Sequence, residues 1–314
     1  MTNIEMSEEQ KFSLASKNNK HSLDDKHLAI EKIAIDSSYS LLRKRFASDK
    51  IAIIGMFVFI ILIIVAIFAP QISPYDPNKT VGMFEAGPTS SNLLGTDEIG
   101  RDVLSRLIFG TRVSMFVGIL SVAIYAVIGT VLGLISGYMG GVVDVLIMRF
   151  TEVFMSFPYI LVCLVVVSVI GPNIVTVTAV IGVLGWPTLC RLVRGEVMKL
   201  KRVDYVLAAI SSGYSTPMII FKHLFPNILS LILVNMTFGV ATSILTEASL
   251  SFLGAGVQPP TASWGNMMSN AQSLTVLLSQ WWRWLPAGIL ILISVLSVNF
   301  FGDGLRKAIE GEIK

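Results

Sequence analysis

The sequence predicts an all-α integral membrane protein with six transmembrane helices. The chain of 314 residues is 53% hydrophobic, only 14% of its residues are charged, and its mean hydropathy is +0.72. A soluble domain typically has about 25% charged residues. Charged residues are also missing from four long stretches, which are residues 113–143, 153–190, 224–246 and 284–302. These observations together indicate a chain whose natural solvent is the lipid bilayer.

The predicted spans follow from the length that a helix needs to cross a bilayer. About 20 apolar residues are required, and a charge at the centre of a span costs about 2.5–3.5 kcal/mol on insertion scales. The stretch 153–190 is long enough for two spans, and Gly171, Pro172 and Asn173 interrupt it. We therefore expect spans at about 51–70, 113–138, 152–170, 174–190, 225–246 and 285–302.

The positions of lysine and arginine predict the orientation of these spans. With the N-terminus inside, the cytoplasmic segments hold 19 of the 24 lysines and arginines, and the outside segments hold five. Because loops rich in Lys and Arg stay in the cytoplasm, both termini are predicted to be cytoplasmic. The net charge of +3 indicates no nucleic-acid partner, since most basic residues flank the spans, where anionic lipid explains them.

The sequence predicts three parts of the chain. Residues 1–28 are polar and are predicted to be a disordered cytoplasmic N-terminus. Residues 29–112 are predicted to contain an amphipathic lead-in helix on the inner leaflet, the first span and an outside loop, although the lead-in also reads as a solvated linker. Residues 113–314 hold the other five helices. Before the second span, Thr96 or Asp97 is predicted to cap a short helix that runs to Arg112.

Glycine and proline set expectations for the middle spans. A glycine recurs at every fourth position of the second span, at Gly129, Gly133, Gly137 and Gly141. This spacing predicts one smooth helix face that a neighbouring helix can approach closely. Pro158 and Pro187 are predicted to kink the third and fourth spans.

The loop at 204–226 is predicted to form two short helices that project from the membrane. Asp204 is expected to cap a helix over 205–212, and Gly213 to end it in the left-handed conformation. Ser215 is expected to cap a second helix with Pro217 in its first turn. Ala208 and Ala209 are expected to keep one surface flat. We interpret the loop as a docking site for a cytoplasmic partner, the alternative being a simple linker.

The segment after the fifth span is apolar and rich in glycine, which is unusual for a solvated loop. It suggests a re-entrant or pore-lining element at residues 247–266. Glu247 at its start is a candidate pathway residue, because acids at membrane depth usually face a cavity. The alternative is that Glu247 lies at the membrane interface.

No catalytic, cofactor or metal site is predicted in this chain. The sequence has no phosphate-binding G-x-x-x-x-G-K-[ST] loop, and its three histidines, His21, His27 and His223, are scattered. Cys163 and Cys190 lack metal-ligand spacing and are interpreted as buried hydrophobes. Six spans without an energy-coupling motif indicate a pathway subunit that another protein drives.

The 204–226 loop resembles the loop by which permease subunits of ABC importers bind their ATPases. That pattern is Glu-Ala-Ala, three residues, Gly, nine residues and Ile-x-Leu-Pro. Ala208, Ala209, Gly213 and Pro226 match it in register, whereas Leu207, His223 and Phe225 replace Glu, Ile and Leu. The loss of the glutamate puts one polar contact of the generic loop in doubt.

Other segments resemble the peptide/nickel branch of these importers, and its C-type permease. They read LGTDEIGRDVLSR at 94–106, EASLSFLGAGVQPP at 247–260, SWG at 263–265 and GDGLR at 302–306. The short first outside loop and the lead-in favour the C-type over the B-type partner. The residues that carry this signature are Gly95, Thr96, Asp97, Gly100, Arg101, Asp102, Glu247, Gly254, Trp264 and Gly265.

The resemblance implies the permease fold of type I ABC importers and a set of partners. These are a second permease subunit, two cytoplasmic ATPases that bind ATP and Mg²⁺, an extracytoplasmic solute-binding protein and the plasma membrane of a prokaryote. The ATPases would contact the 204–226 loop, through Asp204, Tyr205, Ala208, Ala209, Gly213, Ser215, His223 and Pro226.

The substrate stays open at this point. Di- or oligopeptides are the leading hypothesis, and nickel or a metal chelate is the alternative within the family, because specificity lies mainly in the separate binding protein. A non-transporting membrane scaffold or enzyme is the alternative from another class.

Overall fold

The computed structural model describes residues 43–310, which fall into two compact units. One unit comprises residues 50–306, and the other contains residues 43–49 and 307–310 of the described chain. The predicted disordered segment 1–28 and most of the predicted lead-in helix lie outside the described residues. Residues 43–48 are helical.

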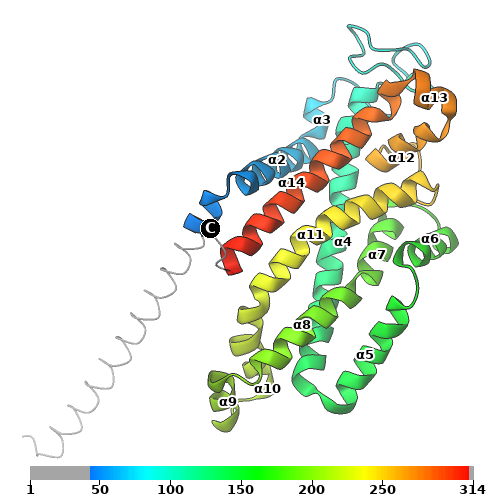
Figure 1. Ribbon diagram of the computed structural model, residues 1–314. Helices are drawn as coiled ribbons and strands as arrows, with labels where there is room; N and C mark the ends of the chain where they lie inside the picture. The colour runs from blue at the N-terminus through cyan, green and yellow to red at the C-terminus, as the bar shows by residue number, and fades with distance from the viewer. Residues whose placement is uncertain (1–42, 311–314) are drawn as a thin grey trace, which may run out of the picture. The chain divides into compact units, whose positions relative to one another are not determined.

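Helices account for almost all regular structure between residues 43 and 310, where no β-strand forms beyond two isolated bridges. Figure 1 shows their arrangement. The α-helices are α2 (Lys50–Ile67), α3 (Ala69–Ile72), α4 (Val103–Met139), α5 (Gly141–Met155), α6 (Tyr159–Ile170), α7 (Ile174–Leu184), α8 (Trp186–Leu200), α9 (Asp204–Ser211), α10 (Thr216–Met218), α11 (Phe225–Phe252), α12 (Trp264–Met268), α13 (Leu274–Ser279) and α14 (Leu285–Glu310). A π-helix covers Ile219–Leu224, and short 3₁₀ turns cover Ser269–Gln272 and Trp281–Arg283.

The predicted all-α membrane fold is confirmed. Within residues 43–310, five helical segments are long and apolar enough to cross a membrane, namely Lys50–Ile67, Val103–Met139, Ile174–Leu200, Thr216–Phe252 and Leu285–Glu310. A sixth span is present if α5 and α6, which are bent by 81° at residues 156–158, count together. Pro158 lies at this bend and Pro187 lies in the first turn of α8, so both expected prolines mark breaks in helices.

The second span begins earlier than the sequence predicts, because the expected short helix before it and the span are one continuous helix. The predicted cap was also wrong. Asp102 rather than Thr96 or Asp97 caps the helix, and its carboxylate accepts a hydrogen bond from the Ser105 N–H at 2.7 Å. From there α4 runs for 37 residues without a break. The charge pattern did not indicate this earlier start, because Arg106 and Arg112 lie before the charge-free stretch but inside the helix.

Three other predicted boundaries were too short. α8 extends ten residues beyond the expected end at 190, and α11 extends through Phe252, so that Glu247 lies inside the fifth span rather than after it. The segment 139–151, expected as a loop, is largely helical, because α5 begins at Gly141. In each case the helix continues past the point where charged residues begin.

Three of the four predicted glycines of the second span face α8. A Cβ atom at Gly133 would lie 2.7 Å from Cβ of Val193 and 2.8 Å from the carbonyl oxygen of Cys190. One at Gly137 would lie 2.8 Å from Cβ of Val197. Gly141 does not belong to this face, because α4 ends at Met139 and Gly141 begins α5 with φ of +53°. The glycine face is therefore confirmed for three positions and wrong for the fourth.

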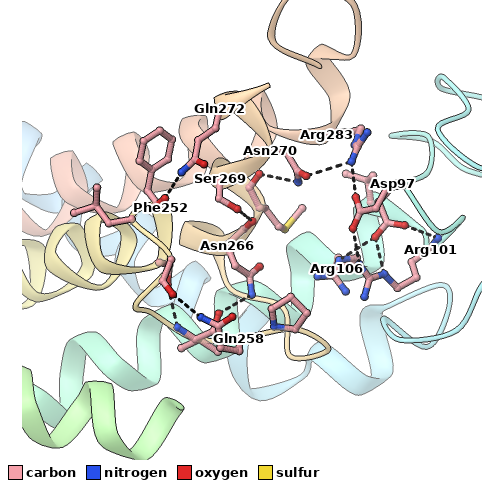
Figure 2. A pocket seen from close by; sticks show the side chains of 18 residues that line it. Asp97, Arg101, Arg106, Phe252, Gln258, Asn266, Ser269, Asn270, Gln272 and Arg283 are labelled. Atoms are coloured by element: carbon pink, nitrogen blue, oxygen red, sulfur yellow. Dashed lines mark hydrogen bonds and ion pairs between the residues drawn. The ribbon is translucent and has the colours of Figure 1, made fainter. Parts of the chain in front are cut away.

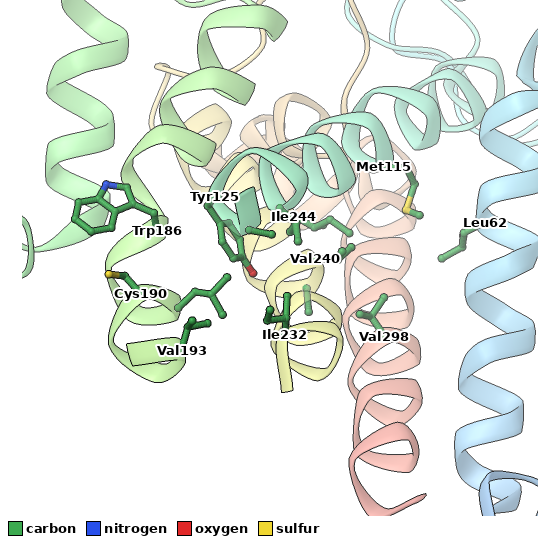
Figure 3. Close-up of a cluster of buried hydrophobic side chains, with 14 of the residues drawn as sticks. Leu62, Met115, Tyr125, Trp186, Cys190, Val193, Ile232, Val240, Ile244 and Val298 are labelled. Atoms are coloured by element: carbon green, nitrogen blue, oxygen red, sulfur yellow. The ribbon is translucent and has the colours of Figure 1, made fainter. Parts of the chain in front are cut away.

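The buried side chains of unit 50–306 gather around α4. Figure 3 shows Tyr125 of α4 between Trp186, Cys190 and Val193 of α8 and Ile232, Val240 and Ile244 of α11, whereas Met115 lies on the side of Leu62 of α2. Both cysteines are fully buried, as the sequence predicts. α4 packs against α2, α7, α8 and α11, so it is the central helix of this unit.

An ion pair fastens α5 to α8 near the end of α4. Arg194 donates from Nη2 to Oδ2 of Asp144 at 2.6 Å, and from Nε to the other carboxylate oxygen at 2.5 Å. Ser136 of α4 donates to the same carboxylate. Such a bidentate pair is stronger and more directional than a single contact between two charges.

In the smaller unit, the two chain segments are joined by polar contacts. Nζ of Lys307 lies 2.9 Å from Oδ2 of Asp49, and Nη1 of Arg45 donates to the carbonyl of Ala308 at 3.5 Å.

The contact between α4 and α8 gives a stability prediction. Replacing Gly133 with Ala should destabilise the protein by about 1–3 kcal/mol, because the new methyl group overpacks the contact with Val193 and Cys190. The check is the midpoint of thermal unfolding in detergent. Gly195 of α8 is the matched control, since a Cβ there meets nothing within 4 Å. Gly195→Ala should leave the midpoint unchanged or raise it, and an equal loss in both variants would contradict the packing argument.

Candidate functional site

The 204–226 loop ends its first helix by a specific hydrogen-bond pattern. The N–H of Gly213 donates to the carbonyl of Ile210 at 3.0 Å, and the N–H of Tyr214 donates to the carbonyl of Ala209 at 3.2 Å. These two bonds define a Schellman motif, which requires a left-handed residue at the position of Gly213. Its φ is +77°, as the sequence predicts. α9 begins at Asp204, with Val203 as the capping residue, so the expected cap was one position late.

This loop presents an apolar surface to its surroundings. Tyr205, Leu207, Ile210, Tyr214, Met218 and Phe221 are all exposed, and Phe221 is 70% exposed. Beneath them Val206, Ile219 and Leu224 are buried. Ala209 is buried and Ala208 exposed, so the two alanines do not share the flat surface that we expected. Gly213, Ser215 and Pro226 are exposed as well.

His223 joins the two halves of the loop. Its ring stacks on Tyr214 with centroids 6.0 Å apart, and Tyr205 lies 6.4 Å away. The buried Nε2 of His223 has no hydrogen-bond partner among the described residues. Tyr214 was not among the predicted site residues. Its contact with His223 depends on the π-helix at Ile219–Leu224, which contains His223. The spacing of residues in the sequence does not indicate this contact.

At the other end of α4, Asp97 organises the 94–106 segment. Its carboxylate accepts from the N–H of Ile99 at 3.1 Å, from the N–H of Arg101 at 2.9 Å and from Nε of Arg101 at 2.6 Å. Nε of Arg106 lies 3.5 Å from the same carboxylate. Asp97, Arg101 and Arg106 are each at most 5% exposed. Because buried charges must be paired, these three residues depend on one another.

The other residues of this segment form turns and caps. Gly95 and Gly100 have φ of +68° and +78°, and a Cβ at either would lie 2.5 Å from a carbonyl oxygen. The hydroxyl of Thr96 donates to the carbonyl of Met83 and accepts from the N–H of Ala86. Asp102 accepts from Ser105 and, at 2.9 Å, from the Asn92 amide. Thr96 and Asp102 thus hold the loop onto the start of α4.

Arg283 ties this segment to the loop before α14. It lies 2.9 Å from Glu85, pairs with Glu98, and donates to Asn270 at 3.2 Å. Figure 2 shows Arg283, Asp97, Arg101 and Arg106 on one wall of a cavity, with Asn266 and Gln272 on another. The cavity has a volume of about 320 Å³. Arg283 was not predicted, because its acidic partners, Glu98 and Glu85, lie 185 and 198 residues away in sequence.

Glu247 lies in a buried network that joins three helices. It is fully buried and accepts from Ser114 of α4 at 3.1 Å and from Ser251 of α11 at 2.8 Å. Ser114 in turn accepts from the N–H of Trp264, whose ring is fully buried against α4. Glu247 lines neither the cavity above nor the one described below. Its role in a pathway stays a prediction.

Gly254 and Gly265 allow the close turns around this network. Gly254 has φ of +83°, and a second Schellman motif ends α11 there, with Gly254 donating to Ser251 and Ala255 to Leu250. A Cβ at Gly265 would lie 2.7 Å from both Ala248 and Ser251. The six predicted residues from 95 to 102 and the four from 247 to 265 therefore lie at the same end of α4, opposite the 204–226 loop (Figure 1).

Comparisons with known proteins assign the family. Residues 129–314 match the family described as binding-protein-dependent transport system inner membrane component. Residues 37–88 match the N-terminal TM domain of oligopeptide transport permease C. Together the two matches include the glycine face, the 204–226 loop and α2.

Individual relatives agree with this assignment. The chain is 38% identical to the oligopeptide transport system permease protein OppC of Bacillus subtilis, over 86% of this chain and 88% of the relative. It is 39% identical to the dipeptide transport system permease protein DppC of Haemophilus influenzae, over 86% and 93%. It is 38% identical to the glutathione transport system permease protein GsiD of Pectobacterium atrosepticum, over 86% and 90%. The chain thus belongs to the inner membrane components of binding-protein-dependent transport systems, as a C-type permease of the peptide ABC transporter family.

Proposed function

We propose that this chain is one of two permease subunits of an ATP-driven importer of di- and oligopeptides. Its partners are a second permease, two ATPases that bind ATP and Mg²⁺, and a solute-binding protein that delivers the peptide. The chain itself holds no cofactor and catalyses no reaction. Both of its termini face the cytoplasm. The names of its relatives, which cite dipeptides, oligopeptides and glutathione, support peptides as the substrate class.

The observation that carries this proposal is the shape of the 204–226 loop. It follows α8 as two short helices, α9 and α10, on either side of Gly213, and it exposes several large apolar side chains from Tyr205 to Phe221. Exposed apolar side chains gathered in one place usually mark a protein interface. An ATPase that closes on ATP could move this loop as one body, because the Schellman motif and the His223 stack fix its two halves together.

Leu207, which stands where the generic loop has glutamate, fits this surface. Leu207 is 46% exposed and lies among the other exposed apolar side chains of α9. The contact with the ATPase is accordingly expected to rely on apolar burial, which salt does not screen, rather than on an ion pair, which salt weakens.

The first test concerns coupling. Gly213→Val should reduce peptide uptake per ATP hydrolysed by roughly 5- to 30-fold, because a left-handed conformation costs a residue with a side chain about 1–2 kcal/mol, and more if it is β-branched. Uptake and ATP hydrolysis are measured together in proteoliposomes that contain all subunits.

Gly171→Val is the matched control for that variant. Gly171 also has a positive φ, of +111°, and a Cβ there also meets nothing within 4 Å, but it lies between α6 and α7. It should lose stability without changing the ratio of uptake to hydrolysis. A normal ratio in Gly213→Val would contradict the role of the loop.

The second test concerns the substrate. Proteoliposomes with the full set of subunits should accumulate a radiolabelled tripeptide in the presence of ATP. Accumulation of nickel ions or a nickel chelate without peptide uptake would overturn the peptide proposal while leaving the permease family intact.

The third test concerns the apolar contact between the 204–226 loop and the ATPase. Co-purification of the ATPase should persist at 1 M salt, where the Debye length is about 3 Å and ion pairs are screened.

A further inference from the structure

A second cavity lies at the middle of unit 50–306, away from both sites described above. Its volume is about 500 Å³, which falls in the range of about 300–1,000 Å³ for small-ligand sites. α4, α7, α8 and α11 and the bend between α5 and α6 surround it. Its lining includes Tyr125, Phe157, Thr188, Asn235, Phe238 and Thr242.

Two helix breaks, the bend between α5 and α6 and the break between α7 and α8, line this cavity. Met155, Phe157 and Tyr159 flank the 81° bend, and Gly185 and Pro187 form the break between α7 and α8. Pro187 has no N–H to donate to the carbonyl of Val183, and the last carbonyls of α5 lose their helical partners where that helix stops. Inside a membrane, such backbone groups are tolerated only where protein covers them or where they line a water-filled cavity.

The cavity lies at the depth where a transported molecule is furthest from either surface. Gly185 is near the middle of the span Ile174–Leu200, and Asn235 and Thr242 lie on either side of the middle of α11. The bend at 156–158 also divides its pair of helices about midway. Broken helices at mid-membrane are the usual place where transport proteins expose hydrogen-bonding groups to a substrate.

The lining offers uncharged hydrogen-bonding groups beside apolar surface. No lining residue of this cavity is an acid, a base, a histidine or a cysteine. The side-chain amide of Asn235 makes no hydrogen bond to any described residue, which leaves two donors and an acceptor. The Thr242 hydroxyl donates to the carbonyl of Phe238 at 3.1 Å, and its oxygen can still accept. Phe157 and Phe238 supply the apolar part.

Part of the cavity wall is open at the surface of the chain. Met155 and Phe157 are exposed by 44% and 61%, and Thr188 and Thr242 are exposed too. Tyr125 forms the closed side, where it is only 7% exposed and its hydroxyl lies 3.5 Å from the carbonyl of Asn235. A ligand can therefore enter from the open side and rest against Tyr125 and α11.

We propose that this cavity binds the backbone of the transported peptide during its passage, which deepens and rests on the proposed function. The amide of Asn235 and the hydroxyls of Thr188 and Thr242 exchange hydrogen bonds with peptide amides, and the phenylalanines contact side chains. Every peptide has amides, whereas its side-chain charges vary. An uncharged wall therefore accepts peptides of different sequence alike.

The first experiment removes one hydroxyl from the wall. In the complete transporter, Thr242→Val should lower uptake of a neutral tripeptide roughly five- to tenfold, as expected for one lost hydrogen bond. Thr237→Val is the matched control. Thr237 lies on the same helix and donates to its own helix, to the carbonyl of Val234 at 2.7 Å, but does not line the cavity. Equal losses in both variants would overturn the proposal.

The second experiment adds a charge of either sign at the same position. Thr242→Asp should favour uptake of a lysine-rich tripeptide over a glutamate-rich one, and Thr242→Lys should reverse the preference, by tenfold or more in each direction. A residue with only a structural role would lower both uptakes in parallel, and that parallel loss would sink the proposal.

Labelling of Thr242→Cys separates this inference from the proposed function. In the complete transporter a small thiol reagent should modify the new cysteine, while the fully buried Cys163 and Cys190 stay unmodified, and tripeptide should slow the reaction severalfold. If wild-type transports peptide but the cysteine is inaccessible, a lipid or the second permease fills the cavity and only this inference fails. If wild-type transports no peptide, the proposed function fails first.

Discussion

The close approach of α8 to α4 is the constraint on which the rest of unit 50–306 depends. Three glycines, Gly129, Gly133 and Gly137, remove the side chains that would hold the two helices apart. In lipid there is little hydrophobic drive between helices, so close packing contributes most of the association. Once α8 lies there, its N-terminal end at Trp186 is fixed against α4, and its C-terminal end leads directly into the 204–226 loop. One packed face therefore positions both the helix break at mid-membrane and the projecting loop.

The same backbone device occurs near each end of α4, but beside different chemistry. A Schellman motif with a left-handed glycine ends α9 at Gly213 and ends α11 at Gly254. Around Gly213 the surface is apolar and exposed, as a surface that binds another protein would be. Near Gly254 buried arginines and acids join the loops, through Asp97, Arg101 and Arg283. Because a buried ion cluster is destabilised strongly when one partner is removed, it fixes the loops in one arrangement rather than adding much net stability.

The sequence predicted what depends on local chemistry and missed what depends on distant contacts. Charge-free stretches located the spans, and Gly213 was predicted to be left-handed because only glycine takes that conformation easily there. The cap of α4 was wrong because Thr96, Asp97 and Asp102 are all good capping residues, and only the fold of the preceding loop decides among them. Arg283 and the central cavity could not be predicted, since each depends on segments far apart in the chain. The contact of Tyr214 with His223 depends on the π-helix between residues 219 and 224, which the sequence pattern did not indicate.

The positions of charged residues around α4 bear on where selectivity can arise. Paired charges lie at the start of α4 and again near its end, at Asp97 with Arg101 and at Asp144 with Arg194, and the cavity between them has none in its lining. A fixed charge at that depth would be costly without a partner, and it would also bind oppositely charged peptides too tightly to release them. An uncharged cavity avoids both effects, but it cannot tell one peptide from another by charge. On the proposed function, the choice among peptides then falls to the solute-binding protein, and this chain supplies a path that treats most peptides alike.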